Sequence, residues 1–239
     1  MELHIENNVL LGFKRDGYMW LNGEPEYMHL VVPDTVTAIA DYAFSGCREI
    51  YGVTIPGSVK TIGKEAFSGC RNLRDVVIEE GVETIGDRAF EMGFYGDVLI
   101  FPNSLRSIGA SAFKDTRMTT MRLPKNLESI GTQAFNSCMN LESASIPGTV
   151  TMVPKDAFAY CWYLEEVILA DGIRCIEADA FFECRKLTEI KLPQSLSYLD
   201  KDAFRECYAI EKVWLPNHLK DQAEAAFRDV YPEVEYIYY

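Results

Sequence analysis

The residues best equipped for chemistry in this sequence are cysteines that return at one fixed place in a repeated pattern. Six of the seven follow the Phe of an Ala-Phe pair by three residues, as in "EAFSGC" at residues 65–70. These six, called the ladder cysteines below, are Cys47, Cys70, Cys138, Cys161, Cys184 and Cys207. Thiols placed in this way could bind a metal ion, pair as disulfides or fill small buried spaces.

The spacing of the cysteines favours the last of these roles. A zinc-type site uses cysteine or histidine pairs a few residues apart, and no two cysteines here are closer than nine residues. Disulfides between neighbouring repeats are compatible with the spacing and stay open as an alternative. Because free cysteine is among the most buried residue types, we predict that all six ladder cysteines are reduced and buried. Cys175 lies outside the pattern, just before Ile176.

The other groups that could catalyse a reaction are scattered. The three histidines, His4, His29 and His218, fall in no nucleophile–base arrangement that the sequence shows. The adjacent carboxylates Glu165 and Glu166 would face opposite sides of a strand or lie in a solvated patch. No dinucleotide-binding, phosphate-loop or HExxH motif is present. We therefore predict a protein that is not an enzyme and that uses no metal and no cofactor.

The elements that hold these residues follow from a repeat. Ala-Phe pairs end at Phe44, Phe67, Phe90, Phe113, Phe135, Phe158, Phe181, Phe204 and Phe227, in steps of 23 residues with a single step of 22. A period this constant along nearly the whole chain predicts a solenoid of stacked units rather than two conventional domains. Equivalent residues then stack on one another, at about the 4.8 Å spacing of neighbouring strands. Phe stacks on Phe, and the Ala before it leaves room for the ring.

Two hydrophobic periods alternate within one repeat. In "LRDVVIEE" at residues 73–80, apolar residues alternate as a strand requires. In "IGKEAFSGC" at residues 62–70, Ile62, Ala66 and Cys70 fall four residues apart, which predicts one face of a short helix. The glycine after the Ile fits a tight turn into that helix. Proline ends most of the strands at the same height, because it lacks the N–H that a ladder needs.

This register predicts a fold class, an α/β solenoid with one parallel sheet. The predicted strands number about ten and lie near residues 27–32, 50–55, 73–78, 96–101, 118–123, 141–146, 164–169, 187–192, 210–215 and 233–238. The third and fourth repeats depart from the pattern together. Gly93 and Thr116 replace the ladder cysteine, and Gly96 and Met118 replace the first Leu of the strand. Sequence drift and a locally reshaped surface both stay open as explanations.

The combined pattern resembles the leucine-rich repeats of the bacterial surface-antigen family named after BspA. That repeat runs roughly as Leu-x-x-Ile-x-Ile-Pro, Ser-Val, Ile-Gly, Ala-Phe, Cys. "LESASIPGTVTMVPKDAFAYC" at residues 141–161 and "LTEIKLPQSLSYLDKDAFREC" at residues 187–207 match it slot by slot, and the resemblance covers about residues 27–239. It implies a leucine-rich-repeat horseshoe, with a concave parallel sheet and short convex helical turns. It also implies an adhesive or host-binding role on secreted or surface-attached bacterial proteins.

The pattern divides the chain into three parts. They are an N-terminal β-meander cap (1–26), the leucine-rich repeats (27–218), and a C-terminal capping helix with a last strand (219–239). The first cap is inferred from Asp16-Gly17 and Asn22-Gly23, which are turn dipeptides between apolar runs. The last strand would place Tyr236 and Tyr238 in core slots and leave an apolar edge. That edge leaves a weak dimer open.

We expect a binding site on the concave sheet face and on the rim beside it. Toward the C-terminal half, this face combines carboxylates with apolar and aromatic residues. The rim, formed by the two residues after each ladder-cysteine position, carries large aromatics. The predicted contact residues are Trp162, Tyr163, Glu165, Glu166, Ile168, Glu189, Glu211, Trp214, Phe94 and Tyr95. Exposed aromatics of this kind are typical interface anchors, and partial burial against the next repeat fits the rim equally well.

Charge narrows the class of partner. The net charge of −13, from 23 basic and 36 acidic residues, repels nucleic acid and anionic lipid. No run approaches the ~18 apolar residues that a membrane span needs. The predicted partner is a protein that is basic and partly apolar, bound by a chain that is a monomer or a weak dimer.

The predicted function is a non-catalytic, adhesin-like protein-binding module. The alternative is a structural spacer or a self-associating element that works through its terminal strand edge. The start "MELHIENNVLLGF" lacks the basic and apolar regions of a signal peptide. A secreted or surface location therefore rests on the resemblance, and a cytoplasmic location stays open.

Overall fold

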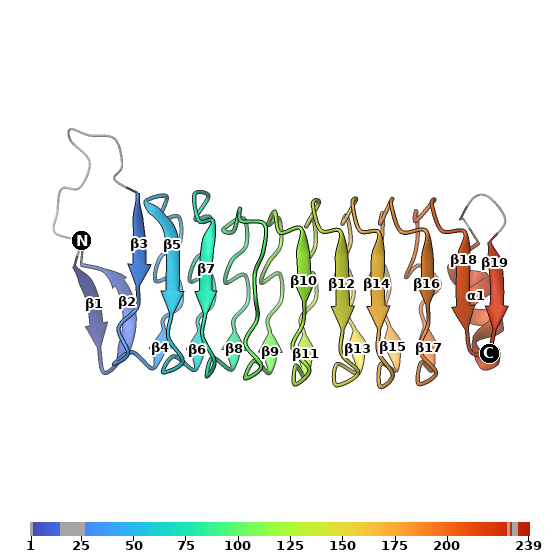
Figure 1. Ribbon diagram of the computed structural model, residues 1–239, viewed down its shortest axis with the longest axis horizontal. Coiled ribbons are helices and arrows are strands. Elements are labelled where there is room, and N and C mark those ends of the chain that lie inside the picture. Colours follow the sequence, from blue (N-terminus) through green and yellow to red (C-terminus); the bar gives the residue numbers. More distant parts are fainter. Residues whose placement is uncertain (1, 15–26, 229, 231–233) are drawn as a thin grey trace.

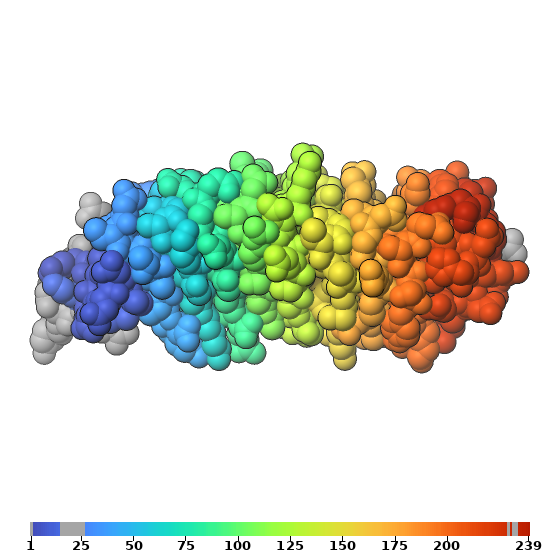
Figure 2. All heavy atoms as spheres, turned by 90° about the horizontal axis from the view of Figure 1, so that it is seen from below, coloured from blue at the N-terminus to red at the C-terminus, as the bar shows by residue number. Residues whose placement is uncertain are grey.

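The computed structural model describes residues 2–14, 27–228, 230 and 234–239, and they form a solenoid (Figure 1). Each repeat contributes one rung, and the rungs stack into an elongated rod in two perpendicular views (Figures 1 and 2). Longer strands form one wall of the rod, and we call its outer surface the long-strand face. It is the face that was predicted to be concave. The rod shows no strong curvature in either view, so the horseshoe shape is not confirmed.

The long-strand wall follows the predicted register closely. Its strands are β3 (Met28–Val31), β5 (Ile50–Ile55), β7 (Asp75–Ile78), β10 (Thr120–Arg122), β12 (Ser143–Ile146), β14 (Glu166–Leu169), β16 (Glu189–Lys191), β18 (Lys212–Leu215) and β19 (Glu235–Tyr238). They pair as β3-β5-β7, β10-β12-β14 and β16-β18-β19. The wall is therefore interrupted between β14 and β16, and also at residues 96–101. There the predicted strand is replaced by an isolated bridge from Val98 to Thr120.

The opposite wall consists of parallel two-residue strands, divided between two sheets, where short helices were predicted. Its strands are β4 (Ala38–Ile39), β6 (Thr61–Ile62), β8 (Thr84–Ile85), β9 (Ser107–Ile108), β11 (Ser129–Ile130), β13 (Met152–Val153), β15 (Cys175–Ile176) and β17 (Tyr198–Leu199). The prediction of helices within the repeats is wrong for the described residues. Their helices are η1 (Asn217–Leu219) and α1 (Lys220–Ala226), both near the C-terminal end.

Except at Phe227, which directly follows α1, the backbone around each ladder Phe turns too sharply to be a helix. Residues two before and two after it have left-handed φ values in most rungs, as at Glu65 (53°) and Gly69 (69°) around Phe67. Such residues do not occur inside an α-helix. Backbone N–H groups bond to the next rung instead, and the Phe44 N–H donates to the Ala66 carbonyl at 2.8 Å. The four-residue spacing thus predicts which side chains are buried, because a double turn buries the same ones.

The glycine after each inward Ile is needed for close stacking rather than for a turn into a helix. Gly63 does not have a positive φ, and a Cβ on it would lie 2.6 Å from the Ala40 carbonyl carbon of the preceding rung. Gly131 in the same slot donates its N–H to the Ile108 carbonyl at 2.8 Å. Pro154 follows in this slot and has no N–H. Accordingly, β11 and β13 belong to different sheets.

The ladder phenylalanines form one continuous stack through the core, as predicted. Successive ring centroids are 4.9–5.6 Å apart and the ring planes are nearly parallel. Phe13 meets Phe44 edge-on at 5.0 Å at one end, and Tyr236 meets Phe227 edge-on at 6.5 Å at the other. All the ladder rings are buried. This stack forms the centre of the hydrophobic core that joins the two walls.

The ladder cysteines pack beside the phenylalanine stack and form no disulfide with one another. All are buried except Cys47, which is half-buried because the first rung has a repeat stacked on one side only. The prediction of burial is therefore wrong for Cys47. Each buried thiol donates to the carbonyl of the ladder Phe in the preceding rung at 3.0–3.4 Å, as Cys207 does to Phe181. Burial raises the pKa of Cys138 to about 12.

The irregular third and fourth repeats contain compensating changes in the core. Gly96 stands where the neighbouring rungs have Leu73 and Met118, and the Phe94 ring is fully buried against it. A Cβ on Gly96 would lie 2.7 Å from Phe94 Cζ, so the ring fills the space that the Leu leaves. The prediction that Phe94 is an exposed rim residue is therefore wrong. Thr116 takes a ladder-cysteine slot, and its buried hydroxyl donates to the Phe113 carbonyl at 2.8 Å.

The N-terminal end of the rod is an antiparallel hairpin. Its strands β1 (Leu3–Glu6) and β2 (Val9–Phe13) are joined by Asn7 and Asn8, both left-handed, as a tight hairpin turn requires. In turn, β2 pairs with β4 in parallel and so continues the wall of short strands. The turns predicted at 16–17 and 22–23 lie outside the described residues.

At the C-terminal end, η1 and α1 precede β19, which pairs in parallel with β18. Tyr236 is half-buried, whereas Tyr238 is 39% exposed. The predicted core slot is therefore wrong for Tyr238, because no further rung of the described chain covers that side of β19. The outer edge of this strand closes the long-strand wall.

Candidate protein-binding face

The composition of the long-strand face follows from the strand period of two. Inward residues alternate with outward ones, so equivalent outward residues line up in rows along the rod. Register pairs Glu189 with Lys212, and Lys191 with Trp214, across β16 and β18. Over the last four rungs the two rows are Glu166, Glu189, Lys212 and Glu235, and Ile168, Lys191, Trp214 and Ile237. One row is mainly acidic and the other mainly apolar.

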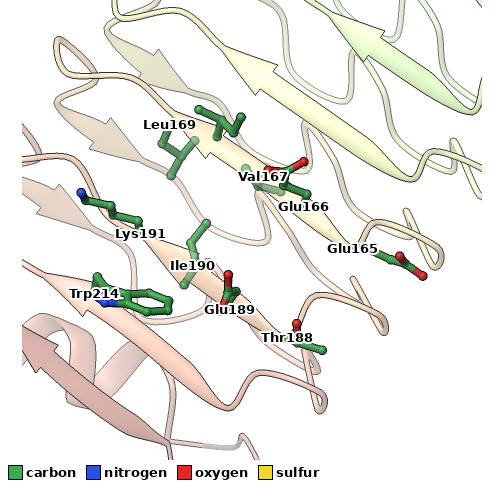
Figure 3. A pocket seen from close by; sticks show the side chains of 10 residues that line it. Glu165, Glu166, Val167, Leu169, Thr188, Glu189, Ile190, Lys191 and Trp214 are labelled. Atoms are coloured by element: carbon green, nitrogen blue, oxygen red, sulfur yellow. The ribbon is translucent and has the colours of Figure 1, made fainter.

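The face is hollowed where β14 and β16 lie next to each other without a ladder between them. The hollow has a volume of about 430 Å³ (Figure 3). In Figure 3 the Trp214 indole extends from β18 toward Glu189, whereas the Lys191 ammonium points the opposite way. The structure thus brings together at this hollow the predicted residues Glu165, Glu166, Ile168, Glu189 and Trp214.

The carboxylates of this hollow carry uncompensated negative charge. The side chains of Glu165, Glu166 and Glu189 are exposed and make no hydrogen bond or ion pair within the described part of the chain. Ile168, two residues after Glu166 on β14, is 52% exposed, and Trp214 is half-buried. An apolar, partly aromatic surface therefore lies directly beside the charge.

The lysines on the strands beside the hollow, Lys191 and Lys212, are directed elsewhere. Lys191 lies over the Tyr239 ring, with Nζ 5.3 Å from its centroid. The Tyr239 hydroxyl donates to the Leu192 carbonyl, and burial raises the pKa of this phenol, so it stays protonated as the donor. Lys212 pairs with Glu235 at 3.7 Å. Neither lysine neutralises the hollow.

The rim aromatics are partly engaged within the rod. The Trp162 ring lies under the Arg185 guanidinium at 4.7 Å, and its indole N–H donates to a neighbouring carboxylate at 3.2 Å. Tyr95 lies under Arg117 at 4.9 Å in the same manner. Tyr163, next to Trp162, is 54% exposed. Near the hollow, the rim therefore offers an open tyrosine beside a tryptophan that is already held in place.

Three predicted residues, Glu211, Phe94 and Tyr95, lie away from the hollow. Glu211 is exposed on the same face, just before β18, and does not line the hollow. Tyr95 belongs to the irregular repeats, three rungs before the rung that carries Trp162. The predicted set is thus gathered around the hollow only in part.

A second feature of the long-strand face was missed by the sequence analysis, an aliphatic patch in the N-terminal half. Val31, Val77, Val98 and Ile100 are between 43% and 77% exposed. A hollow of about 350 Å³ lies between residues 96–101 and β10, beside this patch. The signal was present in the sequence, because these residues occupy outward slots of the predicted strands.

Three polar residues on β3, β5 and β7 meet in a way that the sequence did not show. His29 Nε2 lies 2.8 Å from Thr54 Oγ1, and His29 Nδ1 lies 3.5 Å from Asp75 Oδ2. Gly52 makes room for the ring, since a Cβ there would lie 2.3 Å from His29 Nδ1. None of the three polar residues lines the two hollows described above.

Within the described residues, no group of three or more His, Cys, Asp or Glu side chains is close enough to hold a metal ion. No helix in the described part of the chain is long and apolar enough to cross a membrane.

Comparison with known proteins identifies the family of the repeat. The sequence matches the model of the BspA type leucine rich repeat region, with six copies, over residues 23–142 and 128–238. No curated protein matches the sequence.

Solved structures of bacterial leucine-rich repeat proteins share the fold. A leucine-rich repeat protein of T. pallidum is 23% identical with a TM-score of 0.66, over 100% of this chain and 96% of that one. One from Bacteroides ovatus is 19% identical with a TM-score of 0.51, over 100% and 98%. One from Eubacterium ventriosum is 22% identical with a TM-score of 0.54, over 77% and 59%. These likenesses establish the solenoid of stacked rungs.

Proposed function

Because the chain belongs to the BspA-type leucine-rich repeat family, we propose that it is a non-catalytic protein-binding module, adhesin-like in its use. Its partner docks on the C-terminal half of the long-strand face and on the adjoining rim. The observation that carries this proposal is the hollow between β14 and β16, where Ile168 and Trp214 lie beside unpaired carboxylates.

The physical case rests on rigidity and on mixed chemistry. The hollow lies between strands that belong to hydrogen-bonded sheets, so little conformational entropy is lost when a partner binds. Trp214 and Ile168 supply apolar contact area of the kind found in interface hot spots. The carboxylates select a basic partner and speed its association at low salt. A partner that is basic and partly apolar matches both.

The rim extends this surface. Tyr163 is exposed next to Glu165, at the start of the β14 repeat, so one partner could contact both the rim and the hollow. Trp162 is held by Arg185 and would meet a partner without first having to become ordered.

Affinity capture with matched baits tests the proposal. The baits are the intact protein, the Trp214→Ala variant and a Tyr198→Ala variant, whose change lies on the wall of short strands at a side chain that is 51% exposed. We expect host or bacterial extracellular proteins to be retained by the intact protein and by Tyr198→Ala, and lost with Trp214→Ala. The same retained set on all three baits would reject the docking site. No selective retention on any bait would reject the binding function.

A structural spacer or self-associating element is the second candidate, and β19 is the observation that favours it. This strand is the outermost of its sheet, and Tyr238 and Tyr239 beside its edge are exposed. Edge strands of this kind can pair with another chain. Molar mass measured over a range of concentrations separates the candidates. A monomer at high concentration removes the support for self-association.

A further inference from the structure

We propose that the hollow between β14 and β16 receives an arginine side chain of the partner, with its guanidinium between Glu166 and Glu189 and its aliphatic stem against Trp214. This inference rests on the proposed function and assigns the chemistry of the group that the site recognises. The hollow is lined by one of these carboxylates from β14, by the other from β16 and by the Trp214 indole, which extends from β18 toward Glu189 (Figure 3).

The placement of the two carboxylates is the first argument. Glu166 on β14 and Glu189 on β16 occupy the same outward slot of consecutive rungs, on opposite sides of the gap in the sheet. A group that enters this gap therefore meets one carboxylate from each strand. A guanidinium has N–H donors on more than one edge and binds carboxylates in a fixed, planar geometry. An ammonium is a compact, strongly hydrated point charge and is less suited to bridge them.

The state of the neighbouring cations is the second argument. Lys191 and Lys212 lie on the strands that border the hollow, yet they contact Tyr239 and Glu235 instead. The two carboxylates have no partner in the described part of the chain. The charge that would complement them therefore comes from outside the chain.

The third argument is that the rod already uses the proposed contact. Arginine guanidinium groups lie over aromatic rings at three other places, Arg117 on Tyr95, Arg185 on Trp162 and Arg205 on Phe182, at 4.0–4.9 Å. At two of them the arginine is also close to a carboxylate, as Arg205 is to Asp179 at 2.8 Å. The hollow offers the same two components, an aromatic ring and carboxylates, without the arginine.

A small probe tests the inference without a known partner. The probe is acetyl-Leu-Arg-Leu amide, and its controls are the same peptide with citrulline, a neutral isostere, or with lysine. Binding is followed by the NMR shift of the Trp214 indole N–H, assigned with a Trp214→Phe variant. We expect the arginine peptide to shift this signal in a saturable way, the lysine peptide to bind more weakly, and the citrulline peptide to leave the signal unchanged. Equal binding of all three, or no shift with arginine, would overturn the inference.

Two charge-matched double variants sharpen the test. Glu166→Gln/Glu189→Gln removes the carboxylates that line the hollow on β14 and on β16, and Asp97→Asn/Glu142→Gln removes two exposed carboxylates of the long-strand face that do not line it. Loss of charge-assisted hydrogen bonds should weaken the arginine peptide about tenfold in the first variant. Screening at ordinary salt should hold the change to less than about twofold in the second. Equal weakening in both variants would mean that the peptide responds to the overall negative charge of the face rather than to the hollow, and would overturn the inference.

The two proposals can fail separately. If Trp214→Ala abolishes capture of a partner but the two double variants bind the arginine peptide equally, the face is the docking site and the arginine assignment is wrong. If the arginine peptide binds as expected but capture does not depend on Trp214, the docking proposal is the one that fails.

Discussion

A buried side chain in this rod stabilises the protein through its contacts with the rungs on either side of it. Phe135 is fully buried between Phe113 and Phe158, at 5.6 and 5.3 Å. Phe135→Ala should therefore lower the free energy of unfolding by roughly 3–5 kcal/mol. Phe227 has one parallel neighbour, with Tyr236 edge-on at its other side, so Phe227→Ala should cost less. Denaturant unfolding measures both, and equal losses would contradict nearest-neighbour stacking.

The buried thiols make stability depend on pH in the alkaline range. Burial raises the pKa of Cys138 from its usual 9.0 to about 12 in the folded chain. Between these values the unfolded chain releases a proton that the folded chain keeps. The contribution of this thiol to the free energy of unfolding is therefore fully present below pH 9.0. It is lost as the pH rises toward about 12, the pKa of the thiol in the folded chain.

Cys138→Ala should flatten this fall by up to about 1.4 kcal/mol per pH unit. Chemical denaturation at a series of pH values above 9.0 measures the slopes. The intact protein is the reference, and identical slopes for the two proteins would mean that the thiol ionises as easily in the folded chain as in the unfolded one.

Residue types along the rod were predictable where one repeat determines the next. The phenylalanine stack and the burial of most ladder cysteines follow directly from the period. Phe94 was not predictable from its own rim slot, because its burial depends on the missing side chain at Gly96. The stacking of Trp162 under Arg185 could have been found, since the two residues are one repeat apart.

At the scale of the element, the left-handed turns replace the predicted helices. Asp115 has φ 58° two residues after Phe113, and its N–H donates to the Asn136 carbonyl at 2.9 Å. A β-branched side chain is strongly disfavoured in this conformation, whereas Asn tolerates it. Asp115→Val should therefore destabilise the protein by about 1–2 kcal/mol, and Asp115→Asn should leave stability nearly unchanged. Thermal or denaturant unfolding of the pair decides, and a helix at this place would instead tolerate Val about as well as Asn.

The helix was predicted for a reason that remains instructive. A spacing of four residues predicts which side chains are buried, but it does not predict which carbonyl groups accept hydrogen bonds from the backbone N–H groups. In an isolated segment these groups would be satisfied within a helix. In a stack, the neighbouring rung offers its carbonyls, as Ala66 does to Phe44. That choice belongs to the stack and cannot be read from a single repeat.

Considered as a whole, the rod and its family were predictable from the period, and the details of its surface were not. The chemistry of the long-strand face follows from the outward slots, because the strand period of two puts the carboxylates of the hollow, Ile168 and Trp214 on one surface. The hollow depends on the absence of strand pairing between β14 and β16, which no pattern of residues in the sequence predicts. The aliphatic patch in the other half follows from the same outward slots, which Val31, Val77, Val98 and Ile100 occupy.

The central claim is that the C-terminal half of the long-strand face is the binding surface, and one comparison of dissociation constants tests it most directly. Once a partner has been captured, its affinity is measured for the intact protein, Trp214→Ala and Tyr198→Ala. Truncation of a hot-spot aromatic costs about 2 kcal/mol or more, so Trp214→Ala should weaken binding roughly 30-fold. Its unfolding midpoint should shift far less than that of Phe135→Ala, because Trp214 is only half-buried. Tyr198→Ala should bind as the intact protein does. Weakening by Tyr198→Ala, with Trp214→Ala unaffected, would place the partner on the opposite wall and contradict the claim.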